Sequence, residues 1–219
     1  MKKLLTLALS AVLVMSLAAC GAPKETSEAT TDPASQEVMV VDKDKKEVTM
    51  LAEVNAKYFT ESTRHGVVFK DGSNGEKSVL RGLADEKEFY QALIDIGAKA
   101  GDNLTAADMK AGPDNGKSVE GDKLNVFVTW DGLDKEIPFQ DIIKASEERE
   151  SDFRFGGNLA SAEKNNTGCV LCLDSCATGI ASDAAYPTGT TQNKVVDFFG
   201  DDSVLPEDGT VVKVIFRLA

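Results

Sequence analysis

Short segments of alternating side chains constrain the fold of this chain more than any other sequence feature. Residues 124–130 read LNVFVTW, where apolar residues such as Val126 and Val128 take every second position. A period of two is that of a half-buried β-strand. Residues 48–54 and 211–218 show the same period. Shorter strands are expected at residues 67–69, 78–80, 135–137, 153–155 and 195–199.

Only one segment strongly predicts a helix. Asp85 is a candidate N-cap, and Phe89, Ala92 and Leu93 lie on one face at helical spacing. A short helix is also expected over residues 139–146.

The order of these elements predicts the fold class. The turn-forming residues 71–75 predict a hairpin between strands 67–69 and 78–80. Strands outnumber helices and do not alternate with them, which argues against a doubly wound sheet. We therefore expect an α+β fold: an antiparallel-strand-rich single domain with one main amphipathic helix.

The N-terminus predicts export. Lys2 and Lys3 precede an apolar run over residues 4–19 that is too short to span a membrane as a mature helix. The run ends in LAAC, which resembles the lipobox of bacterial lipoproteins, so Cys20 is the expected lipidation site. A cleaved signal peptide without lipid, or an ordinary membrane anchor, is the alternative. The expected location is the bacterial cell envelope, on the outer face of the cytoplasmic membrane or the periplasmic side.

Composition divides the chain into three parts. Residues 1–19 are the expected lipoprotein signal peptide, residues 20–45 the lipid anchor and flexible tether, and residues 46–219 the globular domain. Residues 21–36 contain no Val, Ile, Leu or aromatic side chain with which to build a core. The formal charge is −12, and it becomes −14 once two lysines are removed with the signal peptide. This acidity argues against nucleic acid as a partner.

Common catalytic signatures are missing from the sequence. Residues 111–118 read AGPDNGKS, which departs from a phosphate-binding loop at Ala111 and is interpreted as a turn. There is no Gly-x-Ser-x-Gly motif, and any catalytic triad would need His65, the only histidine. Neither a hydrolase nor a nucleotide-binding enzyme is therefore expected.

Residues 168–176 read GCVLCLDSC and contain the three cysteines that remain if Cys20 carries lipid. The spacing lets Cys169, Cys172 and Cys176 converge if the backbone turns around Asp174 and Ser175. Three thiolates repel one another, and a bound cation relieves that repulsion. Zinc would complete its four ligands with His65. A 4Fe-4S cluster would need His65, Asp174 or an external ligand as its fourth.

Two other readings of the cysteines stay open. Outside the cytoplasm, two of them can pair as a structural disulfide and leave the third free. Thiol–disulfide chemistry is the other, although a reactive cysteine usually opens a helix and Cys169 follows a loop-like segment. His65 can likewise be an ordinary surface or strand-end residue.

Several strings resemble the YdjY-like lipoproteins, a family often labelled ferredoxin-like. They are RHGVVFK, ALIDIGAKAGDN, LNVFVTW and NNTGCVLCLDSC followed by ATGIASDAAYPTG. The label implies an iron–sulfur or electron-transfer role with a redox partner protein. The chain departs from a bacterial ferredoxin run, because Ser175 and Gly179 stand where the third and fourth cysteines belong.

Together these observations predict an extracytoplasmic, lipid-anchored protein that binds a metal or iron–sulfur centre through Cys169, Cys172 and Cys176. Its expected role is redox chemistry, electron transfer or metal handling. The alternative is a non-enzymatic binding or assembly module whose cysteines form a structural disulfide.

Overall fold

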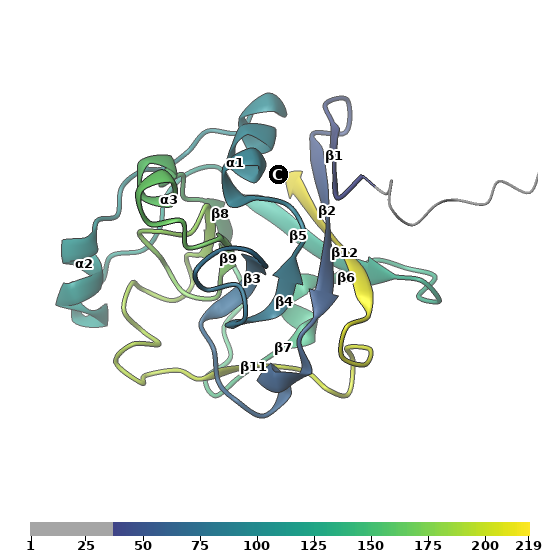
Figure 1. The fold of residues 1–219 in the computed structure, drawn as a ribbon. Helices are drawn as coiled ribbons and strands as arrows, with labels where there is room; N and C mark the ends of the chain where they lie inside the picture. Colours follow the sequence, from purple (N-terminus) through teal and green to yellow (C-terminus); the bar gives the residue numbers. More distant parts are fainter. Residues whose placement is uncertain (1–36) are drawn as a thin grey trace, which may run out of the picture. The chain divides into compact units, whose positions relative to one another are not determined.

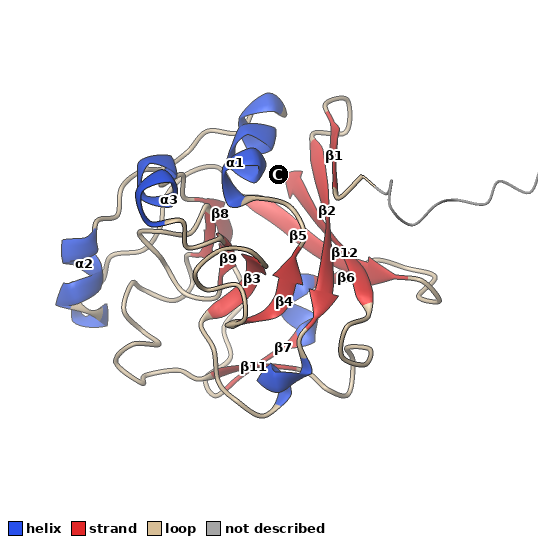
Figure 2. Ribbon diagram, in the orientation of Figure 1, coloured by secondary structure: helices blue, strands red, loops and turns tan. Residues whose placement is uncertain are grey.

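A computed structural model describes residues 37–219, which form one large mixed β-sheet, a small second sheet and three short α-helices (Figures 1 and 2). The strands are β1 (Met39–Asp42), β2 (Glu47–Val54), β3 (His65–Phe69), β4 (Ser78–Gly82), β5 (Leu124–Trp130), β6 (Ile137–Pro138), β7 (Ile143–Ala145), β8 (Phe153–Phe155), β9 (Cys169–Cys172), β10 (Ala181–Asp183), β11 (Phe198–Gly200) and β12 (Val211–Leu218). The helices are α1 (Glu86–Asp95), α2 (Ala106–Ala111) and α3 (Leu159–Asn165), with 3-10 turns η2 (Ala56–Phe59), η3 (Pro113–Asn115) and η4 (Phe139–Ile142).

The predictions for the N-terminus fall outside the described residues. These are the signal peptide, Cys20 and the tether as far as residue 36. Strand β1 precedes residue 46, where the sequence places the start of the globular domain, and it pairs with β2. No helix within residues 37–219 is both long enough and apolar enough to cross a membrane.

The large sheet has the strand order β6-β5-β12-β2-β4-β3-β9-β10-β8, with β1 added beside β2. Its longest strands are β5, β12 and β2, an antiparallel triplet whose alternating sequences predict strands correctly. Val214 lies opposite both Val128 and Met50, and all three side chains are fully buried. The period-two pattern therefore places one face of each strand in the core.

The predicted fold class is wrong. The described chain is mostly β, with a curled mixed sheet and helices of only ten, six and seven residues. The sheet contains two parallel pairs, β3 with β4 and β9 with β10. Strands such as β9 are buried throughout and lack an alternating pattern, so periodicity underestimates the β content.

The predicted hairpin between residues 67–69 and 78–80 is also wrong, because β3 and β4 run parallel. Two successive turns close the connection: Gly72 N–H donates to the Phe69 carbonyl, and Gly75 N–H donates to the Gly72 carbonyl. They return the chain to the start of β3, where His65 lies opposite Ser78. Turn residues indicate that the chain turns, but not how many times.

Two further segments differ in part from expectation. Residues 139–146 form the 3-10 turn η4 and then strand β7 instead of one helix. The strand expected at residues 195–199 begins only at Phe198 and pairs with β7. Helices α2 and α3 have almost no buried face, so no apolar stripe reveals them in the sequence.

Helix α1 forms as predicted and covers part of the sheet (Figure 1). The Asp85 side chain accepts a hydrogen bond from the Lys87 N–H, which satisfies one free donor of the first turn. Phe89 and Leu93 are completely buried. The Phe89 ring packs on Phe216 of β12 with ring centroids 4.6 Å apart.

Replacing Phe89 with Ala should therefore lower the free energy of unfolding by about 3–5 kcal/mol, because it leaves a cavity between α1 and β12. Ile94→Ala is the matched control: Ile94 is on the same helix but 38% exposed, and its loss should cost less than about 1 kcal/mol. Urea titration measures both variants. Equal losses would show that α1 is not anchored through Phe89.

Candidate metal centre

Strands β3 and β9 carry the cysteine cluster. Strand β9 lies inside the sheet between β3 and β10, and it includes Cys169 and Cys172. His65, the first residue of β3, lies directly opposite Cys172. The sheet therefore brings together a histidine and cysteines that are more than a hundred residues apart in sequence.

An irregular register explains how one strand presents two cysteines to one point. In a regular strand, side chains three positions apart point to opposite faces. Between Cys172 and Cys169 the pairing of β3 with β9 shifts twice, around Val67. Such bulges twist a strand locally and re-aim its side chains. Cys169 and Cys172 thus reach the same ring of His65.

The donor atoms of His65, Cys169 and Cys172 all lie within 4.8 Å of one another. His65 Nδ1 is 3.7 Å from Cys169 Sγ. The cysteines are free thiols with at most 1% of their surface exposed, whereas His65 is partly exposed. These three residues form a group that could hold a metal ion.

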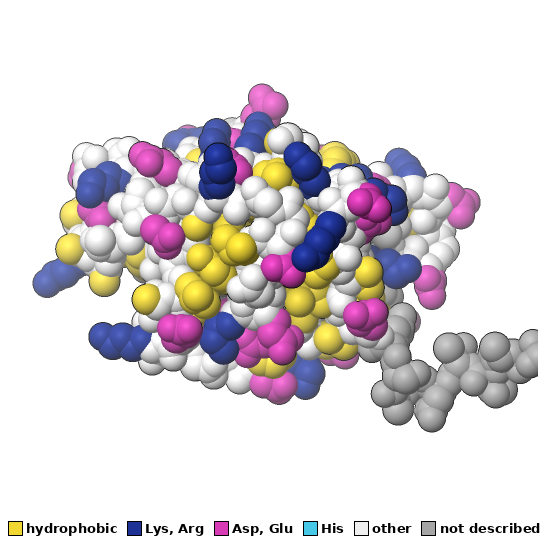
Figure 3. Space-filling view, turned by 90° about the horizontal axis from the view of Figure 1, so that it is seen from above, with side chains coloured by type: hydrophobic (Ala, Val, Ile, Leu, Met, Phe, Trp, Pro, Cys, Tyr) yellow, Lys and Arg dark blue, Asp and Glu magenta, His cyan; other side chains and the backbone are white. Residues whose placement is uncertain are grey.

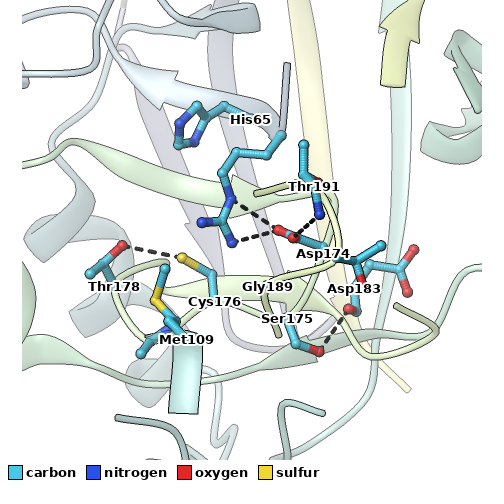
Figure 4. Close-up of polar contacts among 12 residues, drawn as sticks. His65, Met109, Asp174, Ser175, Cys176, Thr178, Asp183, Gly189 and Thr191 are labelled. Atoms are coloured by element: carbon cyan, nitrogen blue, oxygen red, sulfur yellow. Dashed lines mark hydrogen bonds and ion pairs between the residues drawn. The ribbon is translucent and has the colours of Figure 1, made fainter. Parts of the chain in front are cut away.

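Cys176 lies beside this group but not within it. The chain turns through Asp174 and Ser175, both completely buried, before Cys176. Cys176 belongs to the same buried cluster as Val68, Cys169 and Cys172. Its Sγ is 3.2 Å from the Thr178 hydroxyl (Figure 4). The sequence predicts one centre formed by all three cysteines. In the structure His65, Cys169 and Cys172 form the closest group, and Cys176 lies beside it.

The three thiols have different acidities. A hydrogen bond from Cys172 lowers the pKa of Cys169 to about 3 against the effect of burial, and His65 adds to the lowering. Cys172 also lowers the pKa of Cys176 to about 6, although burial acts to raise it. The positive charge of Arg64 adds to the lowering. Cys172 adjoins both thiols, and its contacts with them, together with burial, raise its own pKa well above 9. Without metal, the middle thiol thus keeps its proton and stabilises a thiolate on each side.

A buried ion pair adjoins the thiols. Nε and Nη2 of Arg64 donate to Asp174 Oδ1 at 3.0 and 2.5 Å, and the Thr191 N–H donates to Asp174 Oδ2 at 3.1 Å (Figure 4). Burial acts to lower the pKa of Arg64, but the negative charges of Cys176 and Asp174 outweigh it and raise that pKa. Arg64 therefore supplies permanent positive charge next to the sulfurs.

Gly179 makes room for one of the sulfurs. A Cβ at this position would lie 2.8 Å from Cys172 Sγ and 3.4 Å from Ser182 Oγ. The Ser182 hydroxyl is completely buried and has no hydrogen-bond partner among the described residues. A buried hydroxyl without a partner is costly unless a further group occupies the space beside it.

A separate cavity of about 380 Å³ lies nearby, lined by Leu173, Asp183, Tyr186 and Phe198 among others. Neither His65 nor any cysteine lines it. The sulfur atoms are therefore packed against one another and do not surround this open volume.

Sequence reasoning missed the roles of Arg64, Gly179 and Ser182. Arg64 and Asp174 are 110 positions apart, so no local spacing connects them. Arg64 does precede His65 directly, and this adjacency is the one sequence feature that could have placed Arg64 near the candidate site.

Comparison with known proteins identifies the family. Residues 39–217 match the YdjY domain. The chain belongs to the YdjY domain family. It is 44% identical to the uncharacterized protein YdjY of Escherichia coli (strain K12) over 180 residues. The aligned residues cover 82% of this chain and 78% of that protein. No solved structure matches the chain. The family assignment confirms the YdjY part of the resemblance seen in the sequence, but it does not test the lipoprotein or ferredoxin-like parts and supplies no function.

Replacing Gly179 with Ala should displace Cys172 Sγ and lower zinc affinity by about tenfold or more, as for other residues that orient metal ligands. Gly200→Ala is the control, since its Cβ would crowd Phe59 and Val79 at 3.0 Å, outside the cysteine cluster. Calorimetric titration of both variants measures the effect. Unchanged affinity in Gly179→Ala would show that this space does not position Cys172.

Proposed function

We propose that the YdjY domain of this protein holds a single soft metal ion through His65, Cys169 and Cys172, with Cys176 as the nearest further ligand. The observation that carries the proposal is the mutual proximity of one imidazole nitrogen and two thiol sulfurs, all within 4.8 Å. Thiolate and imidazole together are the donors of zinc and other soft or borderline ions.

The spacing of the donors supports a single ion. Tetrahedral zinc with ordinary bond lengths to sulfur and nitrogen separates these two atoms by about 3.6 Å. His65 Nδ1 and Cys169 Sγ are 3.7 Å apart. An ion of this size would therefore need little rearrangement at this edge of the site.

The same compactness disfavours a 4Fe-4S cluster. A cubane of irons and sulfides must sit between its ligands and hold them apart, whereas these donors are already close and buried. The chain also lacks the cysteine run of a bacterial ferredoxin, because Ser175 and Gly179 stand where the third and fourth cysteines belong. We therefore favour a mononuclear ion over an iron–sulfur centre.

The geometry also weighs against the two thiol readings. The described cysteines are free, so they form no structural disulfide. The low pKa of Cys169 is a property of reactive thiols. Exchange with another protein also requires access, and all three sulfurs belong to residues at most 1% exposed. A resident ion uses the same thiolate character without needing that access.

The cellular setting of this centre is part of the proposal. The lipobox-like sequence before Cys20 supports a lipid-anchored protein of the bacterial envelope, so the membrane is a partner through its lipid. Acidic and basic side chains are interspersed on the face in Figure 3, without the basic patch that nucleic acid requires. A metal-handling role, or electron transfer with a partner protein, fits a buried ion better than hydrolysis, which needs an open coordination position.

Zinc-loaded protein should contain about one ion per chain, and His65→Ala, Cys169→Ser and Cys172→Ser should each lose most of it. Cys176→Ser decides whether this residue is the fourth ligand. Val68→Ala is the control, because Val68 packs in the same cluster but offers no donor. Elemental analysis after dialysis measures the loss. Full retention of metal in the His65 and Cys169 variants would refute the site.

Cys20→Ser should abolish acylation and leave the precursor poorly processed, because the lipobox-like motif requires a cysteine at that position. Membrane fractionation with mass spectrometry of the N-terminus tests this expectation. An unlipidated variant that is still processed normally and held at the membrane would contradict lipid anchoring.

A further inference from the structure

Helix α2 brings one more soft donor to the cysteines. Its first turn is closed by a capping box between Thr105 and Asp108, and Lys117 forms an ion pair with Asp108. No residue of α2 is fully buried, and Met109 is the one that packs against the cysteine cluster. The capping box and the ion pair thus stabilise a short helix, and its Met109 thioether packs against the cysteines.

The Met109 sulfur is held at the Cys176 end of the cluster. The Ala177 N–H donates to Met109 Sδ at 3.4 Å, and Ala177 directly follows Cys176. Figure 4 shows Met109 beside Cys176, on the side where Thr178 contacts Cys176 Sγ. Met109 is only partly buried, so it is more accessible to solvent than the three thiols.

An apolar side chain alone would meet the packing demand at this position. Met109 also contacts a small cluster of Leu104, Val119 and Ala177, which Leu would fill equally well. The difference between Met and Leu here is the polarizable sulfur, which the Ala177 amide orients. The position therefore allows the chemistry of the sulfur to be tested apart from its volume.

The donors at this site are soft. The mutually close group is one imidazole and two thiols, without a carboxylate, and the Cys176 thiol and the Met109 thioether pack beside it. Zinc accepts sulfur, nitrogen and oxygen ligands alike, whereas a neutral thioether adds affinity mainly for monovalent copper.

We propose that the ion held by this site is monovalent copper and that Met109 is a thioether ligand at its Cys176 end. This inference rests on the proposed function, since it names the metal and adds a ligand to the same centre.

The test is an anaerobic titration of the protein with Cu(I) in competition with a chromophoric Cu(I) chelator, and with Zn(II) in a parallel competition. Met109→Leu should weaken Cu(I) binding by about tenfold or more and change Zn(II) binding by less than about threefold. Circular dichroism with thermal unfolding checks the fold. Met109→Gln, which keeps chain length without the sulfur, provides a second variant if the Leu substitution destabilises α2.

The outcomes separate the two proposals. Tighter binding of Cu(I) than of Zn(II), with a selective Cu(I) loss in both Met109 variants, supports the inference. Equal losses for both metals, or none, would overturn the role of Met109. Binding of Zn(II) without Cu(I) would overturn copper as the ion while leaving the single-ion site intact, and binding of neither metal would overturn the proposed function itself.

Discussion

The irregular pairing of β3 with β9 is the constraint on which the candidate site depends. It sets His65 opposite Cys172 and shifts register before Val68 meets Cys169. A regular ladder would separate the two cysteines onto opposite faces of β9. Strand β10 holds the other edge of β9, with Ser182 beside Cys172. The site is therefore built on the sheet itself, and rigid elements position ligands more precisely than loops do.

The buried cluster contains several negative charges, and neighbouring residues compensate for them. Two ionised thiols and the Asp174 carboxylate lie where solvent cannot screen them. Arg64 compensates with its two hydrogen bonds to Asp174, and the Cys172 thiol, whose pKa is raised, adjoins both neighbouring sulfurs and adds no charge. A buried charge without a partner costs several kcal/mol. A bound cation would complete this compensation, which is why the arrangement suits a metal better than free thiols.

The sequence predicted those parts of the structure that local pattern controls. Alternation identified β2, β5 and β12, and spacing identified α1 with its Asp85 cap. Three clustered cysteines and a lone histidine marked the candidate ligands, and three of these four residues form the close group, but the sequence did not predict that Cys169 and Cys172 lie on a strand. The parallel β3–β4 pair was missed because its connection makes two turns in place of one. Arg64 and Met109 were missed because each acts across a long sequence separation, whereas Gly179 is close to Cys172 in sequence but its role depends on how the chain folds back.

A single soft ion bound by sulfur and nitrogen can be recognised by X-ray absorption spectroscopy of the metal-loaded protein, because the spectrum reports the identity and number of ligand atoms around the metal. We expect one metal shell with sulfur and one imidazole nitrogen from His65, and no neighbouring metal atom. A metal–metal distance typical of an iron–sulfur cluster, or a shell made of oxygen alone, would contradict it.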